Sequence, residues 1–302
     1  MSRAALLEPL AGPVREILSG RRDGRSRVAA AIEVPPGQPG WFTPQDAIWT
    51  VHGSVATFVG GIRALLLQAL HPLALAGVQQ HSHYRDDPFG RLQRTGAFIA
   101  ATTFGGEDLA KRTVTGVGRV HQHVQGTAPD GRPYSAADPR LLLWVHVTLV
   151  DSMLTAYQSY GRDGAIDADQ YVANMAVIGR AMGVAKPPTT VAELTRCLAG
   201  FDAELAYDEG TDRMRRFILH PPLPIGLRPG YAVLAAGAID LLQPRHQALL
   251  GATEHRAPAM LIRGASTAIL LRLLRTALVE SPAKAAGGRR LGYETPPGPG
   301  QR

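Results

Sequence analysis

Six of the ten histidines in this 302-residue chain lie between His71 and His146. The surrounding segments carry apolar residues at helical spacing. Histidines on apolar helices are the usual means of holding a metal ion or a haem iron inside a helical protein. Arg91 and Thr95, one helical turn apart, lie in the same stretch. These residue types indicate metal or haem chemistry, and helical phase then decides which histidine faces inward.

His121 has the phase expected of an inward-facing ligand. It shares one face of a predicted helix with an apolar stripe, whereas His123 points elsewhere. Gly116 and Gly118 remove side chains about one turn earlier, which would let a flat macrocycle approach the backbone. A hydrogen-bonded histidine of the core is the alternative for His121. The apolar stripe consists of Val114, Val117, Val120 and Val124.

Arg91 and Thr95 share a helix face and have side chains suited to an oxygen site. The guanidinium of Arg91 would hold a propionate or a bound oxygen, and the hydroxyl of Thr95 would donate a hydrogen bond. The alternative is a surface arginine beside a packed threonine.

Two further histidines are expected to be buried. His71 precedes Pro72 on a strongly apolar helix, where a hydrogen bond to the backbone at a kink is one role and support of the cofactor is another. His146 and Asp151 lie on the most apolar helix, and they indicate an internal polar network or support for a cofactor. His81 and His83, near a helix end, are expected at the surface.

Other catalytic signatures are missing from the chain. It has no GxSxG, P-loop, GxGxxG, CxxC or HExxH motif. No glutamate occurs between Glu33 and Glu107, so the main histidine region lacks the carboxylates of a di-iron bundle.

The patterning predicts an all-α fold. Helix starts and stops recur along the chain, as at Thr43-Pro44, Asp87-Pro88 and Gly105-Gly106, and no convincing strand alternation appears. We expect an N-terminal helix and irregular segment over residues 1–40, one helical domain over 41–280 and a disordered tail over 281–302.

Composition narrows the choice of partner. The formal charge is +7, but the arginines are scattered and have no aromatic interleaving, so nucleic-acid binding is not expected. No stretch reaches 18 uninterrupted apolar residues, and no membrane span is expected. The lone cysteine, Cys197, and the absence of a signal-peptide pattern favour a cytoplasmic protein.

Two long segments carry a family resemblance. QALHPLALAGVQQHSHYRDDPFGRLQRT and RVHQHVQGTAPDGRPYSAADPRLLLWVHVTLVDS resemble the oxygenase family that contains the rubber oxygenases and the fungal MpaB oxygenase. The resemblance implies a globin-like helical domain that binds haem b. It places the axial iron ligand on His121, and Arg91 and Thr95 on the oxygen-binding side.

The chain departs from the family at two places. Arg94 stands where rubber oxygenases have a lysine that can reach the iron. A guanidinium ligates iron poorly, so we expect Arg94 to contact the haem together with Arg91 and Thr95 rather than to bind the iron. Only Asp86 and Asp87 offer carboxylates where a glutamate base is used.

The resemblance implies an enzyme that uses O2 on an apolar unsaturated substrate, isoprenoid- or lipid-like, with oxidative cleavage of a C=C bond as the family reaction. Two alternatives stay open. One is a non-catalytic protein that binds haem or an apolar ligand, and the other is a haem peroxidase or hydroxylase.

Overall fold

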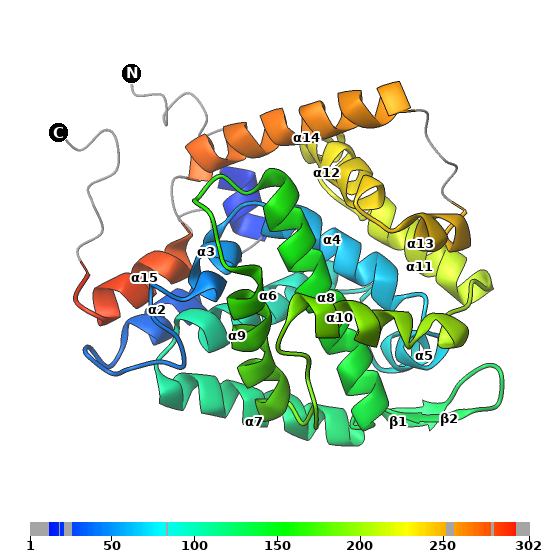
Figure 1. The fold of residues 1–302 in the computed structure, drawn as a ribbon, viewed down its shortest axis with the longest axis horizontal. Coiled ribbons are helices and arrows are strands. Elements are labelled where there is room, and N and C mark those ends of the chain that lie inside the picture. The colour runs from blue at the N-terminus through cyan, green and yellow to red at the C-terminus, as the bar shows by residue number, and fades with distance from the viewer. Residues whose placement is uncertain are drawn as a thin grey trace.

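The computed structural model describes residues 12–17, 19–20, 26–82, 84–251, 257–278 and 281–293. These residues form helices almost throughout, so the prediction of an all-α fold is confirmed (Figure 1). A two-stranded antiparallel hairpin, β1 (Gln125–Thr127) and β2 (Pro133–Ser135), is the sheet within the described residues. The sequence showed no strand pattern there because each strand has three residues.

The helices of the N-terminal half include α8 (Pro139–Tyr160), which lies at the centre of the molecule (Figure 1). The others are α2 (Arg27–Glu33), α3 (Ala47–Gly53), α4 (Thr57–Gln68), α5 (Pro72–His81), α6 (Pro88–Phe104) and α7 (Glu107–His123).

The remaining helices surround that centre. They are α9 (Ala168–Ala181), α10 (Val191–Ala199), α11 (Glu209–Leu219), α12 (Arg228–Asp240), α13 (Pro244–Leu249), α14 (Ala257–Leu278) and α15 (Pro282–Arg290). Two short 3-10 helices, η1 (Asp202–Glu204) and η2 (Ile225–Leu227), connect them.

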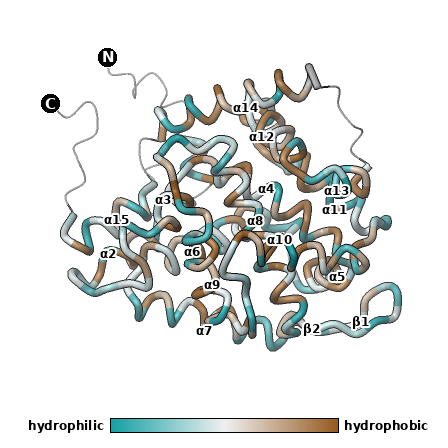
Figure 2. The backbone as a smooth tube through the Cα atoms, in the orientation of Figure 1, coloured by the Kyte–Doolittle hydropathy of each residue, from teal (hydrophilic) through white to brown (hydrophobic). Residues whose placement is uncertain are grey.

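Helix α8 forms the axis of the fold and packs along α4 (Figure 1). Its side chains Trp144, Val147 and Val150 are completely buried. By contrast, hydrophobic and hydrophilic segments alternate along the outer helix α7 (Figure 2). The apolar first half of α8 is therefore explained by its central position.

A buried ion pair joins α4 to α8. Arg63 donates to the carboxylate of Asp151 at 2.6 Å, to the hydroxyl of Ser152 at 2.8 Å and to the carbonyl oxygen of Leu241 at 3.0 Å. The Arg63 side chain is only 2% exposed, so these partners must offset the cost of removing its charge from water.

Helices α6 and α7 form a hairpin whose ends are set by local chemistry. Asp87 caps α6 by accepting from the backbone N–H of Gly90 at 2.9 Å, with Pro88 in the first turn. At the other end Gly105 must be glycine, because a Cβ there would overlap the carbonyl oxygen of Ala101. The two helices pack side by side, so the start of α6 and the end of α7 lie at the same end of the hairpin.

No single helix of the described chain is long and apolar enough to cross a membrane. Helices α3 and α4 would satisfy the length and composition criteria only as a pair, and the pair is bent by 91°.

Two expectations from the sequence are wrong. Residues 281–293 do not form a disordered tail, because Pro282–Arg290 is helix α15 and packs on α2 and α6. Similarly, residues 27–33, expected to be irregular, form α2, whose N-cap Ser26 accepts from the N–H of Ala29. The first segment is short and lies between stretches rich in Gly, Pro and Arg, the second is polar and glycine-rich, and each is stabilised by packing on the other. The rest of the tail, residues 294–302, lies outside the described residues.

The packing of α15 can be tested with two neighbouring glycines. A Cβ at Gly287 would lie 2.8 Å from the carbonyl oxygen of Phe104 and 2.9 Å from the ring of Trp49, whereas one at Gly288 meets nothing closer than 3.9 Å. We predict that Gly287→Ala lowers the free energy of unfolding by about 1–3 kcal/mol through overpacking. Gly288→Ala should leave it unchanged or raise it by up to about 1 kcal/mol. Urea denaturation measures both, and equal effects would contradict the docking of α15.

Candidate functional site

His121 lies in the last turn of α7, and its imidazole makes no hydrogen bond with the described residues. Its side chain is half-buried, and no donor or acceptor among the described residues is within hydrogen-bonding range of the ring. Burial lowers the pKa of the imidazole below its ordinary value and so favours the neutral ring. A neutral imidazole with a free lone pair is what an iron ligand requires.

Helix α5 and the β-hairpin hold the end of α7 in place. The Nε2 of His81 donates to the carbonyl oxygen of Gln125 at 3.1 Å, just beyond the end of α7. The amide of Gln80 donates to the carbonyl oxygen of Thr127 at 2.9 Å and accepts from the hydroxyl of Tyr134 at 2.7 Å. These contacts keep the C-terminal end of α5 close to the His121 end of α7.

Arg91, in the first turns of α6, lies at the same end of the hairpin. Its guanidinium is half-buried and donates to the hydroxyl of Ser82 at 2.7 Å. No carboxylate of the described residues forms an ion pair with it. Burial and, to a smaller extent, the positive charge of Arg94 lower the pKa of the Arg91 guanidinium. A half-buried cation without a counter-ion is suited to bind an anion.

The structure separates Thr95 and Arg94 from Arg91. Thr95 is exposed, and its hydroxyl donates to the carbonyl oxygen of Arg91 at 3.1 Å. Arg94 is also exposed and pairs with Asp87 at 3.1 Å. Neither side chain is therefore held toward the interior with Arg91, although all three were predicted to serve one site.

Small residues leave open space along the hairpin. A Cβ added at Gly96 of α6, or at Gly116 or Gly118 of α7, would meet nothing within 4 Å. Gly96 and Gly116 are exposed and Gly118 is half-buried, so a flat group could approach the backbone at these positions from the surface. Among the described residues the imidazole of His121 has no hydrogen-bond partner and Arg91 has no carboxylate partner, and these residues fit a haem with acidic propionates.

The predicted supporting residues are buried in other parts of the fold. His71 caps the start of α5, and its Nε2 lies 3.3 Å from the carboxylate of Glu204, next to the rings of Trp144 and Phe201. Asp151 pairs with Arg63. Of the other histidines, the Nδ1 of exposed His123 donates to its own helix, and His83 lies outside the described residues.

His146 packs against α9 with its Nε2 buried and unpartnered among the described residues. A Cβ at Gly179 would lie 2.8 Å from the imidazole, so glycine is required for this contact. Burial lowers the pKa of His146 to about 4.

Sequence patterning did not single out His52, which is also buried. Its Nδ1 lies 2.8 Å from the hydroxyl of Thr103 and its Nε2 lies 3.1 Å from the hydroxyl of Tyr171. Burial lowers the pKa of His52 to about 3, and both ring nitrogens have partners. This group joins α3, α6 and α9, and only the three-dimensional packing reveals it.

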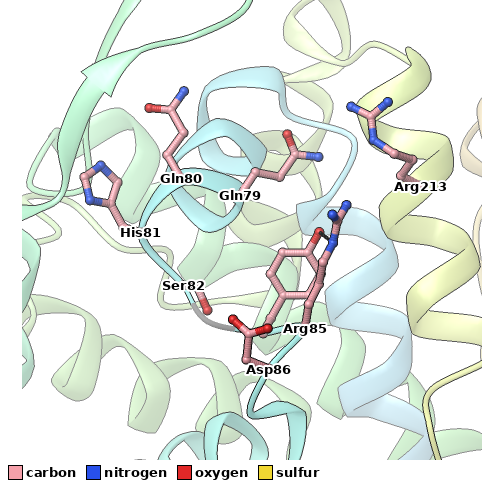
Figure 3. A pocket seen from close by; sticks show the side chains of 8 residues that line it. Gln79, Gln80, His81, Ser82, Arg85, Asp86 and Arg213 are labelled. Carbon is pink, nitrogen blue, oxygen red and sulfur yellow. Dashed lines mark hydrogen bonds between the residues drawn. The ribbon is translucent and has the colours of Figure 1, made fainter.

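A cavity of about 560 Å³ opens beside Arg91. It lies between the end of α5, the segment leading to α6 and one side of α11, as Figure 3 shows. Ser82, which accepts the hydrogen bond from Arg91, belongs to its wall. The wall is completed by Gln79, Gln80, His81, Tyr84, Arg85, Asp86 and Arg213.

A family model described as the catalytic domain of the ER-bound oxygenase mpaB/B' and rubber oxygenase matches residues 49–276. The chain belongs to this family. The matched range begins in α3, ends in α14 and contains Arg91 and His121, so the rubber oxygenase and mpaB catalytic domain covers the whole candidate site. No curated protein and no solved structure gives a significant match.

Membership in the rubber oxygenase and mpaB family makes an oxygenase the supported class of activity, with a small-molecule substrate and O2. The matched range leaves out α2 and α15, which pack on each other. These two helices therefore add to the family domain at one side of the fold.

The depressed pKa of His146 predicts a pH dependence of stability. Between about pH 6.5 and 4 the unfolded chain binds this proton and the folded chain does not. Stability therefore falls as the pH drops through this range, and His146 accounts for about 3 kcal/mol of the loss. The His146→Gln variant should not lose this part of its stability, because glutamine does not bind the proton. Urea denaturation at pH 7 and pH 4 measures the difference, and equal losses in both proteins would contradict the prediction.

Proposed function

We propose that this protein is a haem b-dependent oxygenase in which His121 would hold the haem iron. The observation that carries the proposal is the half-buried imidazole of His121, at the same end of the α6–α7 hairpin as the guanidinium of Arg91; among the described residues the first has no hydrogen-bond partner and the second no carboxylate partner. Membership in an oxygenase family supports the reaction class.

Each residue of the site would have a distinct task. His121 offers a neutral nitrogen as ligand, since burial opposes its protonation. Arg91 supplies positive charge to a propionate or to an oxygen that gains negative charge. The haem, when bound, would supply the iron that activates O2. Gly96, Gly116 and Gly118 would let a macrocycle approach the backbone from the surface, since a Cβ there meets nothing within 4 Å.

Thr95 and Arg94 have weaker support than Arg91. The hydroxyl proton of Thr95 is already donated to the backbone, and Arg94 is held by Asp87 at the surface. We therefore assign the electrostatic role to Arg91.

For the substrate, we propose an apolar unsaturated molecule, isoprenoid- or lipid-like, that is cleaved oxidatively at a C=C bond. Membership in the family supports this substrate class, because rubber oxygenase acts on such a molecule. We also propose that the protein is located in the cytoplasm.

The ligand assignment can be tested by haem binding. We predict that the protein purified with haem, or incubated with haemin, shows a Soret band. His121→Ala should reduce haem uptake at least tenfold, because the ligand nitrogen is lost. His123→Ala is the matched control, since it removes an exposed histidine two residues away on the same helix. Equal haem uptake by both variants would contradict the assignment of His121.

Oxygen uptake tests the rest of the proposal. The haem-loaded protein should consume O2 with squalene, an unsaturated isoprenoid, and the product should contain new carbonyl groups. A protein that binds haem but turns over squalene only with added peroxide would be a peroxidase. One that consumes neither oxidant with any unsaturated lipid would be a binding protein.

A further inference from the structure

The cavity beside Arg91 has a more polar wall than a hydrocarbon substrate needs. Amide, hydroxyl and guanidinium groups from α5, the segment before α6 and α11 surround about 560 Å³, a volume in the range of small-molecule sites. Figure 3 shows the side chains of Gln79, Arg85 and Arg213 converging on this space.

The charges of the wall favour an anion. The wall contains two guanidinium groups, those of Arg85 and Arg213, and one carboxylate, that of Asp86. Arg85 has no carboxylate partner among the described residues, and it donates instead to the hydroxyl of Tyr84 at 3.0 Å. Arg213 pairs with Glu209 at 2.5 Å, but the Glu209 side chain is 85% exposed, so water competes for that ion pair.

Hydrogen bonds fix the other side of the cavity. The amide of Gln79 donates to the carbonyl oxygen of Gly210 at 3.1 Å, which ties α5 to the start of α11. Ser82 accepts from Arg91, so a third guanidinium stands directly behind the wall. The cavity thus adjoins the proposed oxygenase site and carries an excess of positive charge.

We propose that this cavity binds the carboxylate end of an amphipathic substrate, such as an unsaturated fatty acid, with Arg85 and Arg213 as its anion-binding groups. Guanidinium groups pair with carboxylates through charge-assisted hydrogen bonds, while an ester of the same chain offers no charge. The proposal rests on the proposed function, since it takes the ligand of the cavity to be the substrate of the oxygenase.

The experiment compares oleate with methyl oleate by calorimetric titration of the full chain, with and without haem. Oleate should bind at least tenfold more tightly than the ester. Arg213→Gln should weaken oleate binding about tenfold, the loss of one charge-assisted contact, and leave the ester unaffected. Arg216→Gln is the matched control. Arg216 lies on the same helix, pairs with Asp212 and does not belong to the cavity wall.

Arg85→Gln gives the same test outside α11, in case the Arg213 variant unfolds. Equal binding of acid and ester, or equal effects of Arg213→Gln and Arg216→Gln, would overturn the proposal. So would an Arg213→Gln variant that loses haemin but keeps oleate, because the cavity would then hold a propionate. Oleate binding that depends on Arg213 in a protein without any haem uptake would instead refute the proposed function and leave the carboxylate site standing.

Discussion

The tight connection between α6 and α7 is the constraint on which the site depends. Gly105 permits α6 to end and α7 to begin within two residues, since any side chain there would overlap the backbone of α6. Glu107 then donates its N–H to the carbonyl oxygen of Pro39 at 2.9 Å, and Arg290 donates to that of Phe104 at 3.0 Å. With this turn fixed, the two helices run back along each other, and Arg91 and His121 lie at the opposite, open end.

Two histidines near opposite ends of the hairpin differ in whether their ring nitrogens have hydrogen-bond partners. At the closed end Thr103 shares a buried network with His52 and Tyr171, in which both ring nitrogens of the histidine have partners. At the open end the imidazole of His121 has none among the described residues, and Arg91 has only a hydroxyl. Polar groups that are left without partners on a rigid scaffold are available to a ligand. This contrast, more than the number of histidines, locates the candidate site.

Much of the fold could be predicted from the sequence because its signals are local. Asp87-Pro88 and Gly105-Gly106 mark helix ends through capping and close approach, and the structure has helix ends at both, whereas the helix expected from Thr43-Pro44 begins only at Ala47. The half-buried face of α7 that carries His121 also follows from 3.6-residue spacing. Helix α15 was missed, because its stability comes from packing against a distant segment.

The details of the site depend on tertiary contacts that spacing cannot give. Helical spacing places Arg91 and Thr95 on one face of α6. In the structure the guanidinium of Arg91 donates to the hydroxyl of Ser82 and is half-buried, while Thr95 is exposed. Asp151, expected in an internal polar network or in support of a cofactor, pairs with Arg63 in such a network. The cavity wall comes from three separate segments, so its excess of positive charge appears only in the folded chain.

The proposed haem site depends above all on a bond between the imidazole nitrogen of His121 and the iron. The most direct measurement is the absorption spectrum of His121→Gly loaded with haemin, before and after addition of imidazole. We predict a weakened and shifted Soret band that imidazole restores to the native form, because the free base replaces the missing side chain. A native spectrum in the variant without imidazole would contradict the claim.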